Sequence, residues 1–126
     1  MRRVLVCGGR DFHDYGLLCR AMDRAVERWG ISVLIHGAAR GADSLADQWA
    51  KKCGIPVEVY PADWETYKRA AGMIRNRQML IDGRPDLVIA FPGGTGTAGM
   101  IRIATEAGVP VYQIRRRLNI DPPFWR

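Results

Sequence analysis

Short apolar runs alternate with amphipathic segments along this chain, and this alternation restricts the fold more than any other feature. Each run holds four or five strand-forming residues, and most of them end at glycine, proline or His-Gly. Continuous apolar strands of this kind are typical of a parallel sheet that helices cover on both faces. We therefore expect an α/β fold, a Rossmann-like doubly wound domain with a mainly parallel sheet of about five strands. The expected strands are residues 3–7, 31–35, 57–60, 87–91 and 111–114.

Four segments between or after these runs carry apolar residues at helical spacing. In the first segment Asp14 is expected to cap the start of the helix, and Gly30 is expected to end it. Residues 61–72 show no such spacing and are expected to form a long loop. The expected helices cover residues 17–29, 42–53, 73–81 and 98–107.

The basic charge of the chain is concentrated near its end. The formal net charge is +6, from 19 basic and 13 acidic residues. Without residues 115–126, which contain Arg115, Arg116, Arg117, Arg126 and Asp121, 15 basic and 12 acidic residues remain, so half of the excess is lost. We expect one domain over residues 1–114 and a basic, proline-containing tail over 115–126. A solvated tail is favoured over a general face for nucleic acid.

Composition also bears on partners and location. No apolar run approaches the roughly 18 residues that a membrane-spanning helix needs, and no signal peptide is visible. A cytoplasmic protein without a membrane partner is therefore expected. The three cysteines and two histidines show no metal-ligand spacing, so we expect neither a metal site nor a cofactor.

Glycine and polar residues follow each of the first four expected strands. In an open parallel sheet the carboxyl ends of the strands meet at one edge, and ligands bind there. These residues are therefore expected to form one ligand site. The candidate ligand-binding residues are Gly8, Gly9, Arg10, Asp11, Gly37, Arg40, Gly41, Asp43, Asp63, Trp64, Arg75, Asn76, Gly93, Gly94, Thr95, Gly96 and Thr97.

The sequence of the turn after the fourth strand resembles two known nucleotide-binding motifs but matches neither. Gly94, Gly96 and Gly99 fit G-x-G-x-x-G, yet the dinucleotide motif follows a first strand and has an acid about 20 residues later. Here that later position is Ile114. The Walker A motif needs a lysine after its last glycine, and Met100 occupies that place.

A simpler anion site is consistent with the same turn. Gly93, Gly94 and Gly96 allow backbone N–H groups to approach an anion at the start of the following helix, where the helix dipole favours negative charge. Thr95 and Thr97 add hydroxyl donors. A tight turn without a ligand is the structural alternative, although it needs fewer glycines and threonines than this one contains.

Charged and aromatic residues in the other turns have both functional and structural interpretations. Arg10 and Arg40 are suited to bidentate phosphate contacts, or else they are solvent-exposed. Arg75 is expected to clamp a ligand, with a structural ion pair as the alternative. Asp63 is suited to bind a sugar while Trp64 stacks on a base, or Trp64 packs the loop onto the domain.

Together these turns resemble a known superfamily. The P-G-G-x-G-T signature is shared by the DNA-processing protein DprA/Smf, the LOG cytokinin-activating phosphoribohydrolases and lysine-decarboxylase-like proteins, a group called the SLOG superfamily. The combination here is similar to its small stand-alone YspA/YpsA-related branch, often described only as a domain of unknown function. The segments that carry the resemblance are residues 8–11, 36–46, 61–64, 71–76 and 92–97.

This resemblance implies a Rossmann-like fold that binds a nucleotide or a nucleotide-derived ligand. In LOG enzymes the motif continues as P-G-G-x-G-T-x-x-E, and its glutamate, assisted by an arginine on the preceding helix, acts in hydrolysis of an N-glycosidic bond. Arg75 matches the neighbourhood of that arginine, whereas Met100 stands at the glutamate position. Methionine cannot activate water, so Asp11, Asp63 and Arg75 are the remaining catalytic candidates.

Three functions stay open at this point. Binding of a nucleotide-derived ligand by a sensor or carrier is favoured. The alternatives are a LOG-like hydrolase with a substituted carboxylate and, less favoured, a DNA-binding protein that uses the basic tail. Whether the chain catalyses a reaction, and whether it forms a homodimer, stay open as well.

Overall fold

A computed structural model describes residues 1–115 of the chain. Five strands alternate with helices in the expected manner, and their ends differ from the expected ones by about one residue. The strands are β1 (Arg2–Cys7), β2 (Ile31–His36), β3 (Val57–Val59), β4 (Leu87–Ala90) and β5 (Val111–Gln113). The helices are α1 (Tyr15–Trp29), α2 (Ala42–Cys53), α3 (Trp64–Tyr67), the 3₁₀ helix η1 (Lys68–Ala70), α4 (Ala71–Ile81) and α5 (Thr95–Glu106).

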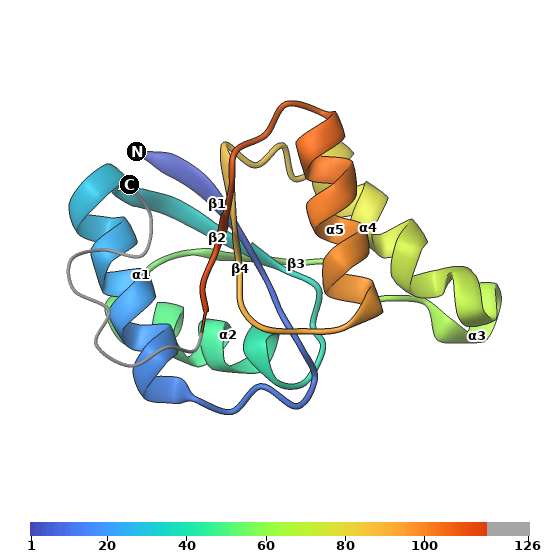
Figure 1. The fold of residues 1–126 in the computed structure, drawn as a ribbon, viewed down its shortest axis with the longest axis horizontal. Helices are drawn as coiled ribbons and strands as arrows, with labels where there is room; N and C mark the ends of the chain where they lie inside the picture. The colour runs from blue at the N-terminus through green and yellow to red at the C-terminus, as the bar shows by residue number, and fades with distance from the viewer. Residues whose placement is uncertain (116–126) are drawn as a thin grey trace.

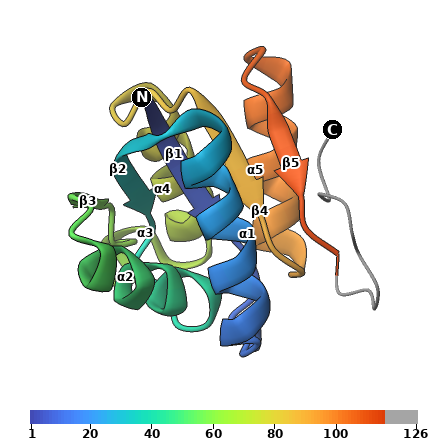
Figure 2. The same ribbon diagram turned by 90° about the vertical axis from the view of Figure 1, so that its left-hand side faces the viewer.

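The five strands form one sheet in the order β3-β2-β1-β4-β5, and all neighbouring strands are parallel. Figure 1 shows α1 and α2 on one face of this sheet and α4 and α5 on the other, and Figure 2 looks onto the sheet from the face that α1 and α2 cover. This arrangement confirms the expected Rossmann-like doubly wound architecture. The strand order reverses between β1 and β4, whose pairing aligns Val6 with Ile89.

Each face of the sheet has its own apolar core. On β1, Val4 and Val6 belong to the core under α1 and α2, whereas Leu5 and Cys7 belong to the core under α4 and α5. Successive residues of a strand point to opposite faces, so a strand buried on both sides must be apolar at every position. This explains why the strands are readable as continuous apolar runs.

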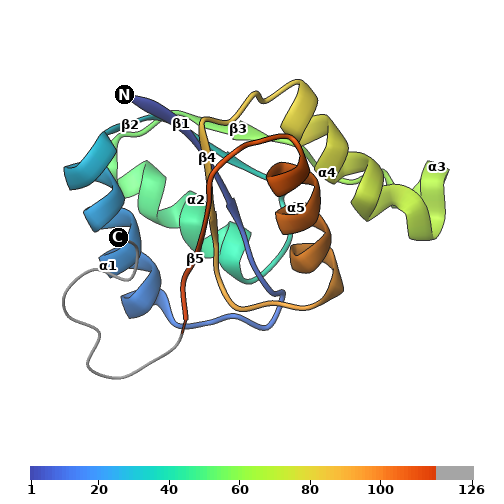
Figure 3. The same ribbon diagram turned by 45° about the horizontal axis from the view of Figure 1, so that its top comes forward.

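The segment 61–72 differs from the expected loop. Asp63 accepts a hydrogen bond from the backbone N–H of Thr66 at 3.1 Å and caps the one-turn helix α3. The helix η1 follows, and α4 begins at Ala71 rather than at residue 73. None of residues 61–70 is buried, and this segment projects beyond the sheet at the far end of α4 (Figures 1 and 3). With no buried face there is no apolar periodicity to mark these helices in the sequence.

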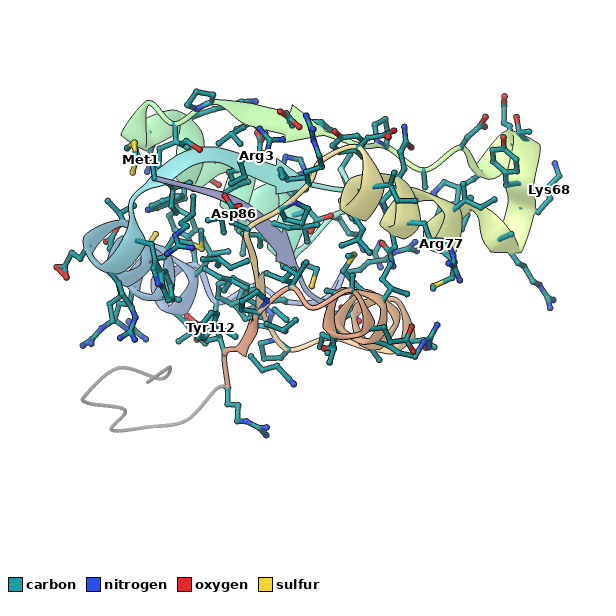
Figure 4. The ribbon with its side chains drawn as sticks, turned by 90° about the horizontal axis from the view of Figure 1, so that it is seen from above. Met1, Arg3, Lys68, Arg77, Asp86 and Tyr112 are labelled. Atoms are coloured by element: carbon teal, nitrogen blue, oxygen red, sulfur yellow. The ribbon has the colours of Figure 1, made fainter. Side chains whose placement is uncertain are left out.

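At the amino ends of the strands, hydrogen bonds and an ion pair connect β1 to β3 and to the segment before β4. The Arg3 side chain donates to the carbonyl oxygen of Gly83 at 2.8 Å from Nε and pairs with Glu58 at 2.8 Å. The carboxylate of Asp86 accepts from the backbone N–H of Arg3 at 2.7 Å, and Figure 4 shows both residues at this edge. The donors and acceptors at this edge therefore satisfy one another.

Residues 116–126, which make up most of the expected basic tail, lie outside the described part of the chain. Within residues 1–115, no helix combines the length and the apolar character that crossing a membrane requires.

Candidate functional site

A cavity of about 880 Å³ lies at the carboxyl ends of the strands. It is bordered by the turns after β1 and β4, the two adjacent strands between which the strand order reverses. This is the position at which open α/β sheets bind their ligands. The volume falls within the range of small-molecule pockets, roughly 300–1,000 Å³.

Most of the residues predicted for a ligand site line this cavity. They come from the turns after β1 and β4, the start of α2, the start of α3 and the middle of α4. The predicted residues that line it are Gly8, Gly9, Arg10, Asp11, Asp43, Trp64, Arg75, Asn76, Gly93, Gly94, Thr95, Gly96 and Thr97. Gly37, Arg40, Gly41 and Asp63 do not line it.

Two of the four outlying residues serve the packing of the turns. The carbonyl oxygen of Gly37 accepts a hydrogen bond from Nη1 of Arg75. Gly41 has a φ of +82°, and a Cβ there would lie 2.7 Å from the carbonyl carbon of Arg10. Glycine at position 41 therefore allows the turn after β2 to pack against the turn after β1.

The other two outlying residues are exposed. Arg40 lies 3.6 Å from the carboxylate of Asp11, and both side chains are largely in solvent. An exposed pair of this kind contributes little to stability. Asp63 is engaged as the cap of α3. The structure thus gives Asp63 a structural task and leaves Asp11 at the exposed rim of the cavity.

The turn after β2 is held together by its own side chains. One carboxylate oxygen of Asp43 accepts from the backbone N–H groups of Gly37 at 3.1 Å and Ala39 at 3.2 Å. Nδ1 of His36 accepts from the N–H of Ala38 at 3.0 Å, while its Nε2 lies 2.8 Å from Asp47. Three successive amides are therefore already bonded, so they are not available to an incoming anion.

Burial raises the pKa of Asp43, although the hydrogen bond from Ala39 opposes this effect. The shift follows from the cost of placing a carboxylate away from water. Asp43 is 6% exposed and lines the cavity, so it is a buried carboxylate in the cavity wall.

Replacing Asp43 by alanine is expected to lower the free energy of unfolding by about 2–3 kcal/mol, because the buried N–H of Gly37 and the half-buried N–H of Ala39 lose their acceptor. Asp43→Asn keeps an oxygen acceptor and removes the buried charge, so its loss is expected to stay within about 1 kcal/mol. A raised pKa in the folded state means that the wild type loses stability relative to the asparagine variant as the pH rises above the ordinary carboxyl value of 3.8. Urea unfolding of the three proteins across that pH range measures both effects. Equal losses in the two variants would contradict the role assigned to this oxygen.

The turn after β4 contrasts with the turn after β2. Gly94 is the N-cap of α5, and no side chain caps this helix. The first N–H groups of a helix have no partner within the helix and carry its positive dipole end. Here they belong to residues 95–97, all of which line the cavity. The start of α5 is thus suited to an anion.

Close backbone contact fixes the position of this turn. The N–H of Gly9 donates to the carbonyl oxygen of Pro92 at 2.9 Å. A Cβ at Gly93 would lie 2.7 Å from the nitrogen of Gly9 and 2.9 Å from Cβ of Thr97. Glycine at these positions lets the turns after β1 and β4 touch directly at the floor of the cavity.

Asn76 connects α4 to the start of α5. It is 4% exposed, accepts from Nε of Arg75 at 3.1 Å and donates to the carbonyl oxygen of Gly96 at 3.2 Å. Its two polar atoms are therefore both engaged within the protein. Asn76 is a positioning residue for Arg75 and for the first turn of α5.

Positive charge predominates on the cavity wall. Arg10, Arg69 and Arg75 line it, against Asp11 and Asp43. Asp43 is engaged with its own turn, and burial lowers the pKa of Arg75. The guanidinium of a half-buried arginine is stabilised by an anion, so this wall favours a negatively charged ligand.

Several lining residues were not predicted. Arg69, Gly72 and Met73 lie in or beside the segment expected to be a featureless loop, and only the basic charge of Arg69 could have marked it. The others are core residues, or small residues without a reactive group, so their residue types do not mark them as site residues. They are Cys7, Phe12, Ala39, Met79 and Pro92.

Groups for covalent catalysis are poorly placed. Cys7 lines the cavity, but burial raises the pKa of its thiol far above neutrality and keeps it protonated. Met100, at the position of the LOG glutamate, is fully buried in the core under α4 and α5 and does not line the cavity. Of the three catalytic candidates, Asp11 and Arg75 line the cavity and Asp63 does not.

Comparison with known proteins agrees with this geometry. The model of the YspA, cpYpsA-related SLOG family matches residues 2–67. The chain is 39% identical over 120 residues to the Gene 61 protein of Mycobacterium phage D29. This match covers 88% of this chain and 94% of that protein. The resemblance predicted from the turns is thereby confirmed.

Among solved structures, the fold is similar to UDP-GlcNAc 2-epimerase from Neisseria meningitidis bound to UDP-GlcNAc. The TM-score is 0.55 and the identity 19%, over 98% of this chain and 35% of that chain. The chain thus spans about a third of the epimerase, and at this identity the likeness concerns the fold.

Proposed function

Since the chain belongs to the YspA, cpYpsA-related SLOG family, we propose that it binds a nucleotide or a nucleotide-derived phosphate compound as a sensor or carrier. The ligand lies in the cavity between the carboxyl ends of β1 and β4. The observation that carries this proposal is the uncapped start of α5, which lines a cavity whose wall is also rich in arginine.

In this proposal the phosphate binds at the first turn of α5. Beyond the neighbouring residues of the same turn and helix, no protein atom lies within 4 Å of a Cβ added at Gly94 or Gly96, so packing within the protein does not require glycine there. Space of this kind allows an anion to approach the backbone N–H groups closely. The hydroxyls of Thr95 and Thr97 add donors, and Arg75 supplies charge from α4.

Two findings support a nucleotide rather than another anion. The cavity continues from the first turn of α5 past α4 to Trp64, so it has room for more than a phosphate group. The fold is shared with an epimerase whose structure is bound to a nucleotide sugar. The second finding concerns the fold alone.

Hydrolysis of an N-glycosidic bond is the second candidate function. One observation favours it, which is that the carboxylate of Asp11 lies at the rim of the same cavity. Asp63, the other acidic candidate, is engaged in capping α3. Incubation with nucleoside monophosphates and chromatography for the free base separates an enzyme from a sensor, since a sensor leaves the nucleotide intact.

The proposal predicts that at least one of AMP, GMP, CMP, UMP and the corresponding diphosphates binds with a Kd below about 1 mM in calorimetry. Arg75→Ala is expected to raise this Kd at least about tenfold, the order of one charge-assisted contact. Arg77 is the matched control, because it lies on the same helix, is exposed and does not line the cavity (Figure 4).

Arg77→Ala is expected to leave the Kd unchanged. Thermal unfolding of both variants shows whether the structural contact of Arg75 with Gly37 changes the fold as well. If no member of the panel binds, or if both substitutions weaken binding equally, this site does not bind nucleotides as proposed.

A further inference from the structure

Trp64 lies apart from both apolar cores. Its side chain is 46% exposed, and it belongs to neither core cluster. The other described tryptophans differ. Trp49 is 3% exposed and donates from Nε1 to Asp23 at 3.0 Å, and Trp29 packs against Tyr112 with ring centroids 4.9 Å apart. Packing of the folded chain therefore explains Trp29 and Trp49 but leaves most of the Trp64 indole unexplained.

The indole of Trp64 lines the cavity from a segment that is exposed throughout. Residues 61–70 contain no buried side chain, and Figure 4 shows Lys68 at the far end of this segment, beyond α4. On the side of α4, Trp64 lies next to Gly72, where an added Cβ would be 3.5 Å from Cη2. At that distance the Cβ would make ordinary van der Waals contact with the ring, so the indole and the start of α4 are direct neighbours at the cavity wall.

Within residues 1–115, the ring face of Trp64 contacts one cation. The guanidinium carbon of Arg10 lies 5.3 Å from the ring centroid. Arg10 belongs to the turn after β1, next to Gly9, which is hydrogen-bonded to the turn after β4. The side chain of Arg10 therefore rests on the aromatic wall of the cavity, while its backbone belongs to the turn that touches the turn before α5.

Electrostatics explains why Arg10 rests on the indole in the free protein. Arg75, from α4, is close enough that the charge of Arg10 contributes to lowering its pKa, after the larger effect of burial. Two arginines facing one cavity repel each other, and the ring face offers a cation a favourable place away from Arg75. A phosphate between the two arginines would remove this repulsion.

Resting on the proposed function, we propose that Trp64 is the residue that selects a planar base and that Arg10 holds its place in the free protein. When a nucleotide enters, the base stacks on the indole in place of the guanidinium, and the guanidinium turns to the phosphate. A base that stacks on the ring face under Arg10 must displace the guanidinium, so the two contacts on that face exclude each other. The site then favours phosphate esters that carry an aromatic base over sugar phosphates without one.

The test compares AMP, GMP, CMP and UMP with ribose 5-phosphate by calorimetry on the wild type, Trp64→Ala and Trp64→Phe. Trp64→Ala is expected to weaken the tightest nucleotide about tenfold, within the effect of losing one base stack, and to leave ribose 5-phosphate within about twofold. Trp64→Phe keeps a ring and is expected to restore most of the affinity. Because Trp64 is outside both cores, these variants are expected to fold normally.

A second pair of residues provides a matched control. The guanidinium carbon of Arg28 lies 5.2 Å from the ring centroid of Trp29, outside the cavity. Arg28→Ala is expected to change no Kd, whereas Arg10→Ala is expected to weaken nucleotides and ribose 5-phosphate alike. Nucleotides are also expected to quench indole fluorescence in the wild type and in Trp29→Phe but not in Trp64→Phe.

The outcomes separate the two proposals. If neither the nucleotides nor ribose 5-phosphate binds, the proposed function is wrong. If nucleotides bind but Trp64→Ala leaves them unaffected, or weakens them and ribose 5-phosphate equally, the role of Trp64 is wrong while the function stands.

Discussion

Met100→Glu is expected to lower the free energy of unfolding by about 4 kcal/mol near pH 7 and to create no hydrolase. The position is fully buried among apolar residues such as Leu5 and Val88. A carboxyl at this position must be protonated in the folded protein. The ordinary pKa of glutamate is about 4.3, so keeping the carboxyl protonated costs about 1.4 kcal/mol for each pH unit above that value. The substitution restores the spelling of the LOG motif without restoring its chemistry.

The pH dependence identifies the cause of this loss. Because burial raises the pKa of the introduced carboxyl above its unfolded value, the deficit is expected to shrink to about 1 kcal/mol near pH 5 and to grow as the pH rises. Met100→Gln, which is neutral and of similar length, is expected to show a deficit that does not change with pH, and Met100→Leu to lose less than about 1.5 kcal/mol. Urea unfolding near pH 5 and pH 7 measures the three variants.

A stable Met100→Glu protein that releases base from nucleotides would contradict the burial of this position and would favour the hydrolase. The expected loss of stability would instead show that position 100, at which this chain differs from the LOG motif, lies inside the core. A residue at position 100 that packs against β1 and β4 cannot also face a substrate.

The fold was predictable mainly because the three central strands, β1, β2 and β4, are buried on both faces over most of their length. Under that condition every strand position is apolar, and β1 and β4 are visible as unbroken runs. Residues 61–70 could not be predicted in the same way, since none of them is buried and the helices there leave no apolar pattern. Asp63 is a local signal for a helix cap, but an aspartate beside a tryptophan is equally consistent with a sugar contact.

The candidate site was predictable in its location but less so in the task of each residue. Parallel strands bring their carboxyl ends together, so the turns after β1 and β4 had to meet. Whether an amide faces a ligand or its own chain depends on hydrogen bonds that the sequence does not specify. Gly37 and Gly93 both follow strands, yet the N–H of Gly37 is bonded to Asp43, whereas no side chain caps the helix that follows Gly93.

Gly93→Ala is expected to lower the free energy of unfolding by about 2–3 kcal/mol and to weaken nucleotide binding about a hundredfold. Its Cβ would lie 2.7 Å from the nitrogen of Gly9, closer than a Cβ can approach, so the two turns must separate. A separation of about 1 Å at a binding site costs affinity out of proportion to its size. Thermal unfolding and calorimetry with the tightest nucleotide measure the two losses.

Gly96→Ala is the informative comparison, because it separates what the fold needs from what the ligand needs. Beyond its neighbours in the helix, no protein atom lies within 4 Å of a Cβ added at Gly96. The residue is in the first turn of α5, so stability is expected to stay the same or to rise by up to about 1 kcal/mol. Binding is nevertheless expected to weaken at least about tenfold, since the new methyl group takes space where the phosphate approaches the amides. Ala98→Ser, on the same helix but outside the cavity, is expected to change neither quantity. A Gly96→Ala protein that binds nucleotides as well as the wild type would show that the phosphate does not lie at this turn, because nothing else in the described chain requires glycine at that position.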